Sequence, residues 1–190
     1  MSRGGWLQTY TGRRMFPYDP KVAEIVVEDV ARALSLANRF AGHTLVAYSM
    51  AQHDCLVADR CPDRYKLLGL LHNAAKAYIG TLPAPVENDS SMGDYRLLEA
   101  RVQSVIYKAF SVELPGHVAN GMPPEVAYID ARMLATEARD LLGPPPEPWA
   151  WLPDPYPEVI VPVGWQEAEA EFLRAFERYG GKNPLTIGVA

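Results

Sequence analysis

Side chains able to do chemistry interrupt one apolar stretch of the chain, residues 69–81, where His72, Asn73 and Lys76 lie among leucines and alanines. Positions three or four apart share a helix face, so a helix over residues 64–78 places these three side chains on one stripe. The neighbouring apolar face then consists of Leu67, Leu68, Leu71 and Ala75. A buried imidazole or amide without a hydrogen-bond partner is costly. We therefore expect another element to supply polar partners.

Two further residues, His53 and Asp130, could complete a site with His72. Each falls in a different predicted helix. Two imidazoles and a carboxylate can bind a borderline divalent metal. Spacing alone indicates such a site only weakly, because a single histidine in a helix is more often a core or surface residue than a ligand.

Helical patterns run through most of the chain. Ser49 and Gln52 have the form of a capping box at the start of the helix that carries His53 and ends before Pro62. Pro123 and Pro124 begin a helix that reaches about Leu142. Further helices are predicted over residues 29–38, 94–110 and 164–179, and the apolar side of the second of these is Leu97, Leu98, Val102, Val105 and Ile106. The expected fold is an all-α, single-domain bundle with about six helices.

The predicted domain spans residues 1–190 and has four parts. An irregular N-terminal arm (1–20) precedes the helical core (21–142), a surface segment rich in proline and tryptophan (143–163) and a C-terminal helix (164–179). Within the core, residues 82–87 are expected to form a proline-stiffened loop. Tryptophan and tyrosine are favoured at protein interfaces but also seal small cores, so the surface segment has both interpretations.

Composition limits the class of protein. The chain has 190 residues, a hydrophobic content of 48% and a net charge of −5. The hydrophobic content argues against disorder. The negative net charge argues against a general nucleic-acid surface, which usually carries a basic patch. No apolar run is long enough to cross a bilayer, and the start lacks the layout of a secretory signal, so we expect a cytoplasmic protein without membrane contact. Cys55 and Cys61 lack metal-type spacing and are expected to be free buried thiols.

Three sequence phrases resemble the HD-domain phosphohydrolases: YSMAQH (48–53), LLHNAAKAYIG (70–80) and AYID (127–130). The branch of bacterial 5'-deoxynucleotidases and phage deoxynucleotide triphosphohydrolases is the most similar, and the resemblance covers most of the chain. It implies an HD-type helical bundle that hydrolyses phosphate esters of deoxynucleotides. It also implies homo-oligomers, since relatives commonly form them.

The resemblance assigns roles to individual residues. A divalent transition metal is expected at His53, His72, position 73 and Asp130. The pair Arg39-Phe40 corresponds to residues that contact the nucleotide in relatives, and His43 lies in the same motif. The expected ligand is thus a phosphorylated small molecule, in particular a nucleotide.

Four positions depart from the family pattern. Asn73 replaces the aspartate of the histidine–aspartate pair, and Lys76 replaces the glutamate that orients the attacking water. Thr81 replaces an acidic residue in the substrate region, and Glu87 replaces a lysine. The four-ligand set then carries a charge of −1 instead of −2, and Lys76 adds +1. This predicts weak or absent metal binding, although an asparagine carbonyl can ligate a metal and a desolvated lysine can act as a base.

Several functions remain open at this level. The chain could be a phosphohydrolase with an altered metal site, or an inactive protein that binds a nucleotide through Arg39, Phe40 and Lys76. It could also be a lysine-dependent enzyme with different chemistry, in which Lys76 and Glu87 are the catalytic pair. The exchanged charges at positions 76 and 87 predict that these two residues pair in one pocket. A role in protein contact through residues 148–165 is the fourth hypothesis.

Overall fold

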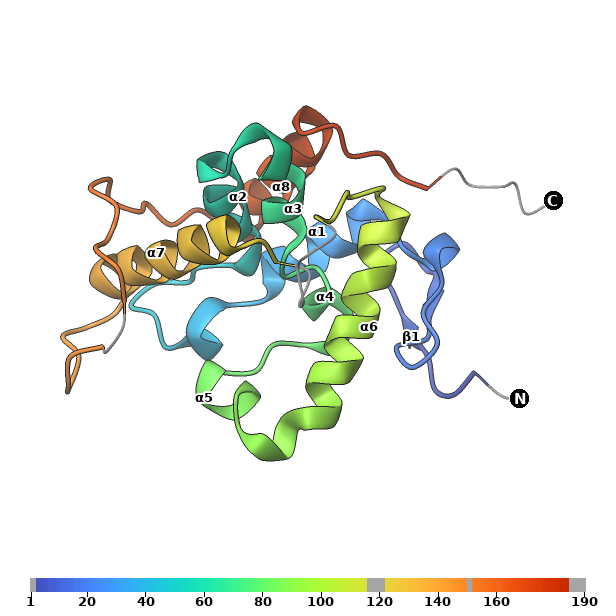
Figure 1. The fold of residues 1–190 in the computed structure, drawn as a ribbon, viewed down its shortest axis with the longest axis horizontal. Helices are drawn as coiled ribbons and strands as arrows, with labels where there is room; N and C mark the ends of the chain where they lie inside the picture. Colours follow the sequence, from blue (N-terminus) through green and yellow to red (C-terminus); the bar gives the residue numbers. More distant parts are fainter. Residues whose placement is uncertain (1–2, 116–121, 150–151, 185–190) are drawn as a thin grey trace.

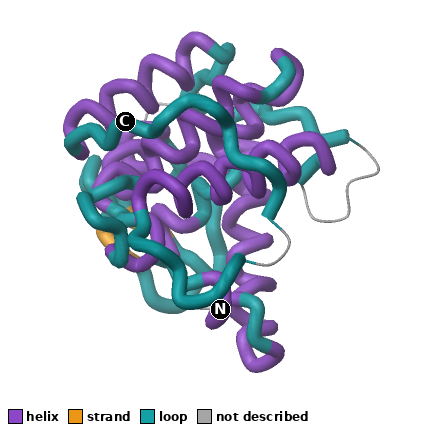
Figure 2. Tube along the Cα trace, turned by 90° about the vertical axis from the view of Figure 1, so that its left-hand side faces the viewer, coloured by secondary structure: helices purple, strands orange, loops and turns teal. Residues whose placement is uncertain are grey.

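Helices form most of the fold in the computed structural model, which describes residues 3–115, 122–149 and 152–184 (Figures 1 and 2). The α-helices are α1 (Val27–Leu36), α2 (Met50–Arg60), α3 (Lys66–Leu71), α4 (Lys76–Ile79), α5 (Ala84–Glu87), α6 (Gly93–Ala109), α7 (Pro124–Leu141) and α8 (Trp165–Arg178). Short 3-10 turns are η1 (Val22–Glu24), η2 (Arg39–Gly42), η3 (Asp63–Tyr65) and η4 (Ser90–Met92). Strands β1 (Leu7–Gln8) and β2 (Arg14–Met15) pair in antiparallel register, with Leu7 opposite Met15. The expected all-α class is confirmed.

Helix α2 is the centre of the packing. It contacts α1, α3, α7 and α8, and α8 also packs along α1. In Figure 1, α2, α3 and α8 lie together, with α7 and α6 on opposite sides of them. Gly69 allows α3 to approach α2 closely, because a Cβ atom at this position would lie 2.7 Å from the Sγ atom of Cys61 and 3.3 Å from the Cα atom of Ala58. Cys55 and Cys61 are free and buried, as predicted.

The start of α2 fixes His53 in its first turn. The Ser49 hydroxyl accepts a hydrogen bond from the Gln52 amide at 3.1 Å, which confirms the predicted N-cap. The Gln52 side chain does not return to the cap. It donates to the Val161 carbonyl and accepts from the Val163 amide, at 2.8 and 3.0 Å. The helix start therefore also anchors the segment that leads into α8.

The continuous helix predicted over residues 64–78 is wrong, because helix α3 ends at Leu71 and α4 begins at Lys76. The cause is Gln103 on α6. Its amide donates to the Leu71 carbonyl at 2.7 Å and accepts from the Ala75 N–H at 2.9 Å, which are the two groups that a regular helix would join to each other. Residues 72–75 instead form tight turns, in which Ala74 N–H donates to the Leu71 carbonyl.

Two smaller expectations also need correction. Leu97, predicted on the apolar side of its helix, is 69% exposed. The stretch expected as a loop, residues 82–87, contains the one-turn helix α5, which accepts Pro85 because a proline in the first turn loses no intrahelical hydrogen bond.

The described part of residues 143–163 has no regular secondary structure and runs along α7, whose side chains hold its backbone. Arg139 donates to the carbonyls of Tyr156 and Glu158, at 2.6 and 2.9 Å. Asp140 accepts from the Ile160 N–H at 2.9 Å. Residues 150 and 151 of the predicted surface segment lie outside the described residues. Among the helices of the described ranges, none has the length and apolar character needed to span a membrane.

Candidate metal centre and adjoining cleft

His53, His72 and Asp130 come together from three elements, as the sequence predicts. His53 lies in α2, His72 directly follows α3, and Asp130 lies in the second turn of α7. One potential ligand atom from each lies within 4.8 Å of the other two. The Oδ1 atom of Asp130 is 3.1 Å from Nε2 of His53 and 3.7 Å from Nε2 of His72. This cluster could hold a metal ion.

Hydrogen bonds fix which nitrogen of each imidazole is available. Nδ1 of His53 donates to the Glu137 carboxylate at 2.6 Å, and Nδ1 of His72 donates to the Gly69 carbonyl at 2.6 Å. Each ring therefore carries its proton on Nδ1 when neutral, which leaves the Nε2 lone pair for a ligand. An acceptor held against the non-ligating nitrogen is the usual support of a metal-binding histidine.

The Nε2 atom of His53 is completely buried and has no hydrogen-bond partner in the part of the chain that is described. The Asp130 carboxylate faces this atom at 3.1 Å. Burial and the Arg39 charge act to lower the pKa of His53, but Glu137 and Asp130 outweigh them and raise it to about 9. Burial likewise acts to raise the pKa of Asp130, yet the two imidazoles hold it well below its usual value of 3.8.

Glu137 connects the metal centre to Arg39. Its carboxylate is fully buried, and it accepts from the Arg39 guanidinium at 2.6 Å as well as from His53. Burial acts to raise the pKa of Glu137, but these two partners lower it, so the carboxylate stays ionised. Arg39, predicted to bind substrate, is therefore already engaged by a buried carboxylate.

Asn73 lies between His72 and a second buried carboxylate, Asp54. The Asn73 amide nitrogen donates to Oδ1 of Asp54 at 2.8 Å and lies 2.7 Å from Nε2 of His72. With this orientation, the amide hydrogen faces the lone pair that a metal would use. Asn73 thus lies against His72, but it presents its amide nitrogen rather than its carbonyl oxygen to the ring.

Lys76 and Glu87 pair directly, as their exchanged charges predict, with Nζ and Oε2 at 3.0 Å. A second carboxylate, Glu99 on α6, lies 3.1 Å from the same Nζ atom. Burial acts to lower the pKa of Lys76, but Glu99 and Glu87 outweigh it and raise the pKa above 10.5. The ammonium group is therefore charged and pairs with these carboxylates, rather than occupying the place of a cation beside Asp130.

A cleft of about 900 Å³ adjoins the metal centre. His72 and Asn73 line it together with the Lys76, Glu87 and Glu99 group, and α6 forms its far wall with Arg96, Gln103 and Tyr107. Four charged side chains line the cleft, and the two cations, Lys76 and Arg96, balance the two carboxylates, Glu87 and Glu99. Among the residues that the resemblance assigns to substrate, Arg39, Phe40, His43 and Thr81 are absent from its lining.

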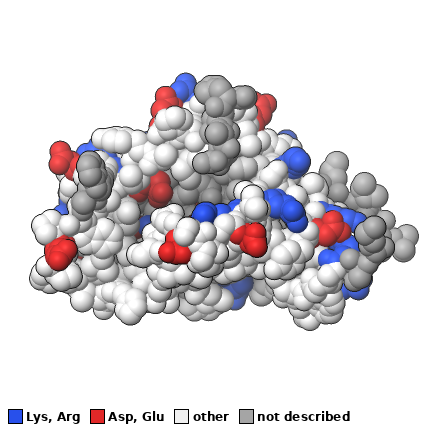
Figure 3. All heavy atoms as spheres, turned by 60° about the horizontal axis from the view of Figure 1, so that its bottom comes forward, with Lys and Arg blue, Asp and Glu red and all other residues white. Residues whose placement is uncertain are grey.

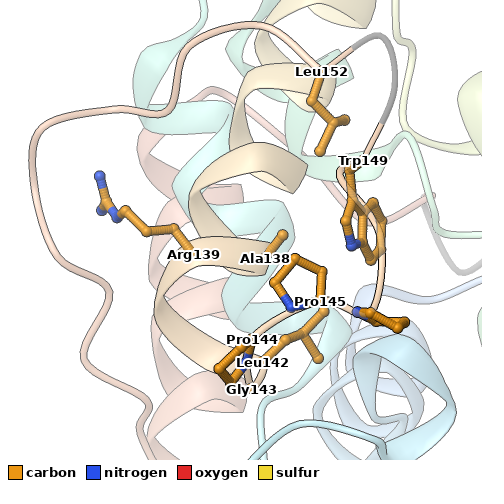
Figure 4. A pocket seen from close by; sticks show the side chains of 9 residues that line it. Ala138, Arg139, Leu142, Gly143, Pro144, Pro145, Trp149 and Leu152 are labelled. Carbon is orange, nitrogen blue, oxygen red and sulfur yellow. The ribbon is translucent and has the colours of Figure 1, made fainter.

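Phe40 instead packs edge-on against Trp149, with 6.3 Å between the ring centroids. Trp149 borders a separate hollow of about 420 Å³ on α7, formed with Leu142, Pro145 and Leu152 (Figure 4). In Figure 4, Arg139 points away from the Trp149 ring. His43 is exposed at the end of η2, and Thr81 is half-buried after α4. Of the predicted substrate residues, Arg39 is thus linked to His53 through Glu137, whereas Phe40 borders the other hollow.

Three acidic residues at the site were missed by the sequence analysis: Asp54, Glu99 and Glu137. Two of them carried a usable signal. Asp54 directly follows His53. Glu137 lies seven residues after Asp130, and this spacing places Asp130 and Glu137 on one face of α7. Glu99 carried none, because its partner Lys76 lies on another element.

On the face shown in Figure 3, basic and acidic side chains are interspersed rather than gathered by sign.

The chain is similar to two bacterial proteins. It is 34% identical to the uncharacterized protein YfdR of Escherichia coli over 140 residues, which is 72% of each chain. It is 28% identical over 147 residues to the uncharacterized protein RCAP_rcc00048 of Rhodobacter capsulatus, which is 73% of this chain and 74% of that protein. No protein-family model matches the chain. The identity and coverage of the first similarity show that this protein belongs to the YfdR family.

Proposed function

We propose that the protein is an HD-type phosphohydrolase with an altered site, which hydrolyses a phosphate ester of a nucleotide-sized molecule with a divalent transition metal. The convergence of two Nε2 atoms and the Asp130 carboxylate carries this proposal. Both imidazoles are held through Nδ1 by acceptors, so neither can turn its Nε2 atom away without losing a hydrogen bond. This is the arrangement that ligating histidines need.

The residues present fit a metal ion. The buried Nε2 atom of His53 lacks a hydrogen bond, which ligation would replace. Two imidazoles and a carboxylate suit Zn²⁺, Mn²⁺, Co²⁺ or Fe²⁺. From the sequence, the positive charge of Lys76 argued against a nearby metal ion. In the structure Lys76 pairs with Glu87 and Glu99, and the three side chains together carry a charge of −1.

A divalent ion bound there would polarise a phosphoryl oxygen and lower the pKa of a bound water. His53, His72 and Asp130 would hold it. In the cleft beside them, the Lys76 ammonium is positioned by Glu87 and Glu99 and can stabilise negative charge that develops on a phosphate. Because the charges that line the cleft balance one another, the bound ion would supply the net positive charge that attracts the anion.

The cleft supports a nucleotide-sized substrate. Its volume of about 900 Å³ lies within the range of small-molecule sites, roughly 300–1,000 Å³. Tyr107 and Leu97 offer apolar surface for a base or sugar, and Ser104 offers a hydrogen-bonding group.

The test combines metal analysis with a phosphate-release assay. We expect the purified chain to contain, or to take up, about one equivalent of Mn²⁺ or Co²⁺, and to release phosphate from a panel of deoxynucleoside mono- and triphosphates. Asp130→Asn removes the ligand charge at a side chain that is 35% exposed, so the fold should persist. We expect this variant to lose about 100-fold or more in activity and metal affinity.

Glu125→Gln is the matched control, because Glu125 lies in the exposed first turn of the same helix and, within the described ranges, its ion-pair partner is the exposed Arg64. Its activity should equal that of the parent. A parent protein that binds no divalent metal and releases no phosphate would contradict the proposal.

One observation favours a second function, metal-free binding of a phosphorylated ligand. The Asn73 amide faces Nε2 of His72 and occupies the lone pair that a metal requires. In that case nucleotides should raise the unfolding temperature in the presence of a chelator. A ligand at 100 times its dissociation constant stabilises by about 2.7 kcal/mol. No shift with any phosphorylated compound would exclude this candidate.

The geometry counts against a lysine-dependent enzyme. A lysine that forms a Schiff base or acts as a base needs a lowered pKa, whereas Glu99 and Glu87 raise that of Lys76. Borohydride should therefore trap no carbonyl compound on Lys76.

A further inference from the structure

Asp54 is a buried carboxylate with an incomplete set of partners. Its side chain is fully buried in α2, directly after His53. The Oδ1 atom accepts one hydrogen bond, from Asn73, and the Oδ2 atom has none within the described residues. Among those residues, the ion pairs of Asp54 are with the imidazoles alone, and neither lysine nor arginine reaches it.

Burying an ionised carboxylate without a cation is costly, so a fold that retains one usually supplies a counter-charge. Glu137 shows the complete case, since it is equally buried but bonds both Arg39 and His53. For Asp54, the available place for a cation is the His53, His72 and Asp130 cluster. Its Oδ1 atom is 3.9 Å from Nε2 of His53, which is a ligand atom of this cluster, and 3.6 Å from Nδ1 of His72, which is the nitrogen that donates to Gly69. Asp54 thus borders the group of three, whose ligand atoms lie within 4.8 Å of one another, without being a member of it.

We propose that Asp54 is the second carboxylate of the metal centre and a donor to the ion together with His53, His72 and Asp130. This inference rests on the proposed function, because it requires that a divalent ion binds there. Two neutral imidazoles and two carboxylates carry a charge of −2, which matches a divalent cation. Asp54 thereby supplies the negative charge that the neutral Asn73 lacks. The two side chains are in contact, since the Asn73 amide donates a hydrogen bond to Asp54.

A purely structural role for Asp54 makes a different prediction. In that case its function is to hold the Asn73 amide, and removing its charge would leave metal binding unchanged. Asp54→Asn separates the two roles, because an asparagine oxygen at position 54 can still accept from the Asn73 amide while the negative charge is gone.

The experiment measures Co²⁺ binding to the full chain by calorimetry and by the visible absorption of the bound ion. We expect Asp54→Asn to weaken Co²⁺ binding by more than about 100-fold, beyond the effect usual for residues outside the ligand set, and to change the absorption spectrum. The unfolding temperature of the metal-free variant should equal or exceed that of the parent. Asp63→Asn is the control, because it makes the same change of charge at a carboxylate that is 97% exposed.

A second variant tests whether the charge can be moved. In Asp54→Asn/Asn73→Asp the carboxylate passes to the side chain that touches Asp54 in the parent, 2.8 Å away. We expect this double variant to recover most of the Co²⁺ affinity lost in Asp54→Asn. If Asp54 only packs, Asp54→Asn keeps the Co²⁺ affinity of the parent and leaves no loss for the double variant to recover.

The outcomes separate the two proposals. If the parent binds Co²⁺ and Asp54→Asn binds it equally well, the role of Asp54 is refuted while the metal centre stands. If the parent binds no divalent metal, both fail. A metal-free Asp54→Asn that unfolds at a much lower temperature and keeps its Co²⁺ affinity also overturns the assignment, in favour of a structural role.

Discussion

At the scale of single residues, the site depends on how each buried charge is balanced. Lys76 is the clearest case, because one ammonium group serves two carboxylates, Glu87 at 3.0 Å and Glu99 at 3.1 Å. Only 12% of the Lys76 side chain is exposed. Without the cation, two partly buried carboxylates would face each other with little water to screen them.

The variant Lys76→Met should therefore lose stability in a pH-dependent way. Burial raises the pKa of Glu99, and removing Lys76 takes away the cation that opposes this rise. When folding raises the pKa of a carboxyl group, its contribution to stability is fully present only at a pH below the pKa of the unfolded chain, here 4.5. This contribution is lost as the pH rises through the pKa of the folded state. We expect a small loss at pH 5 that grows to about 2 kcal/mol at pH 8, measured by urea unfolding.

The control for this variant is Lys66→Met, whose partner Asp63 is almost fully exposed. Its loss should stay below about 1 kcal/mol at both pH values. A loss from Lys76→Met that is equal at pH 5 and pH 8 would contradict the electrostatic explanation.

At the scale of elements, the turn η2, which begins at Arg39, has an unusual backbone conformation. Phe40, Ala41 and Gly42 have successive φ angles of 53°, 51° and 82°, all in the left-handed region. An L-residue pays about 1–2 kcal/mol in this conformation, and glycine avoids the cost. The strain is located directly after the arginine that bonds the buried Glu137.

Gly42→Ala should consequently destabilise the protein by about 1 kcal/mol or more, although a Cβ atom there meets no neighbour. Gly143→Ala is the matched control, because that position is equally open but has no left-handed φ. It should change the free energy of unfolding by less than about 0.5 kcal/mol. Equal losses in the two variants would show that backbone strain is not the cause.

The same scale explains which parts of the fold the sequence predicts. The helix that carries His53 and the two long helices α6 and α7 follow from local periodicity and capping, and their ends agree with the structure within about two residues. The break after Leu71 could not be predicted, because Gln103 enters the helical ladder from an element 32 residues away. His53, His72 and Asp130 were predictable from a resemblance, whereas the position of Asp54 next to His53 gained weight only once the structure showed that its carboxylate is buried.

At the scale of the whole molecule, one buried ion pair joins distant parts of the chain. Arg39 and Glu137 are 98 residues apart and meet at 2.6 Å, with the carboxylate fully buried. The pair connects the turn after α1 to α7 beside the metal centre. Breaking a buried pair is expensive because the remaining charge keeps no adequate partner.

Arg39→Met should accordingly destabilise the protein by about 3 kcal/mol. Arg64→Met is the control, since Arg64 and its partner Glu125 are 64% and 52% exposed, and its loss should be below about 1 kcal/mol. The two variants are compared by urea unfolding at neutral pH. Equal losses would mean that the Arg39 pair contributes no more than a surface pair.

The buried thiols have a practical consequence for measuring motion at this site. Cys55 and Cys61 are enclosed between α2 and its neighbours, and burial raises the pKa of Cys61 to about 11, so neither should react with a maleimide at neutral pH. Val161, by contrast, is 72% exposed on the segment tied to the start of α2 through Gln52. A fluorophore coupled to Val161→Cys would therefore label one position and report on the helix that carries His53, with no need to remove the native cysteines.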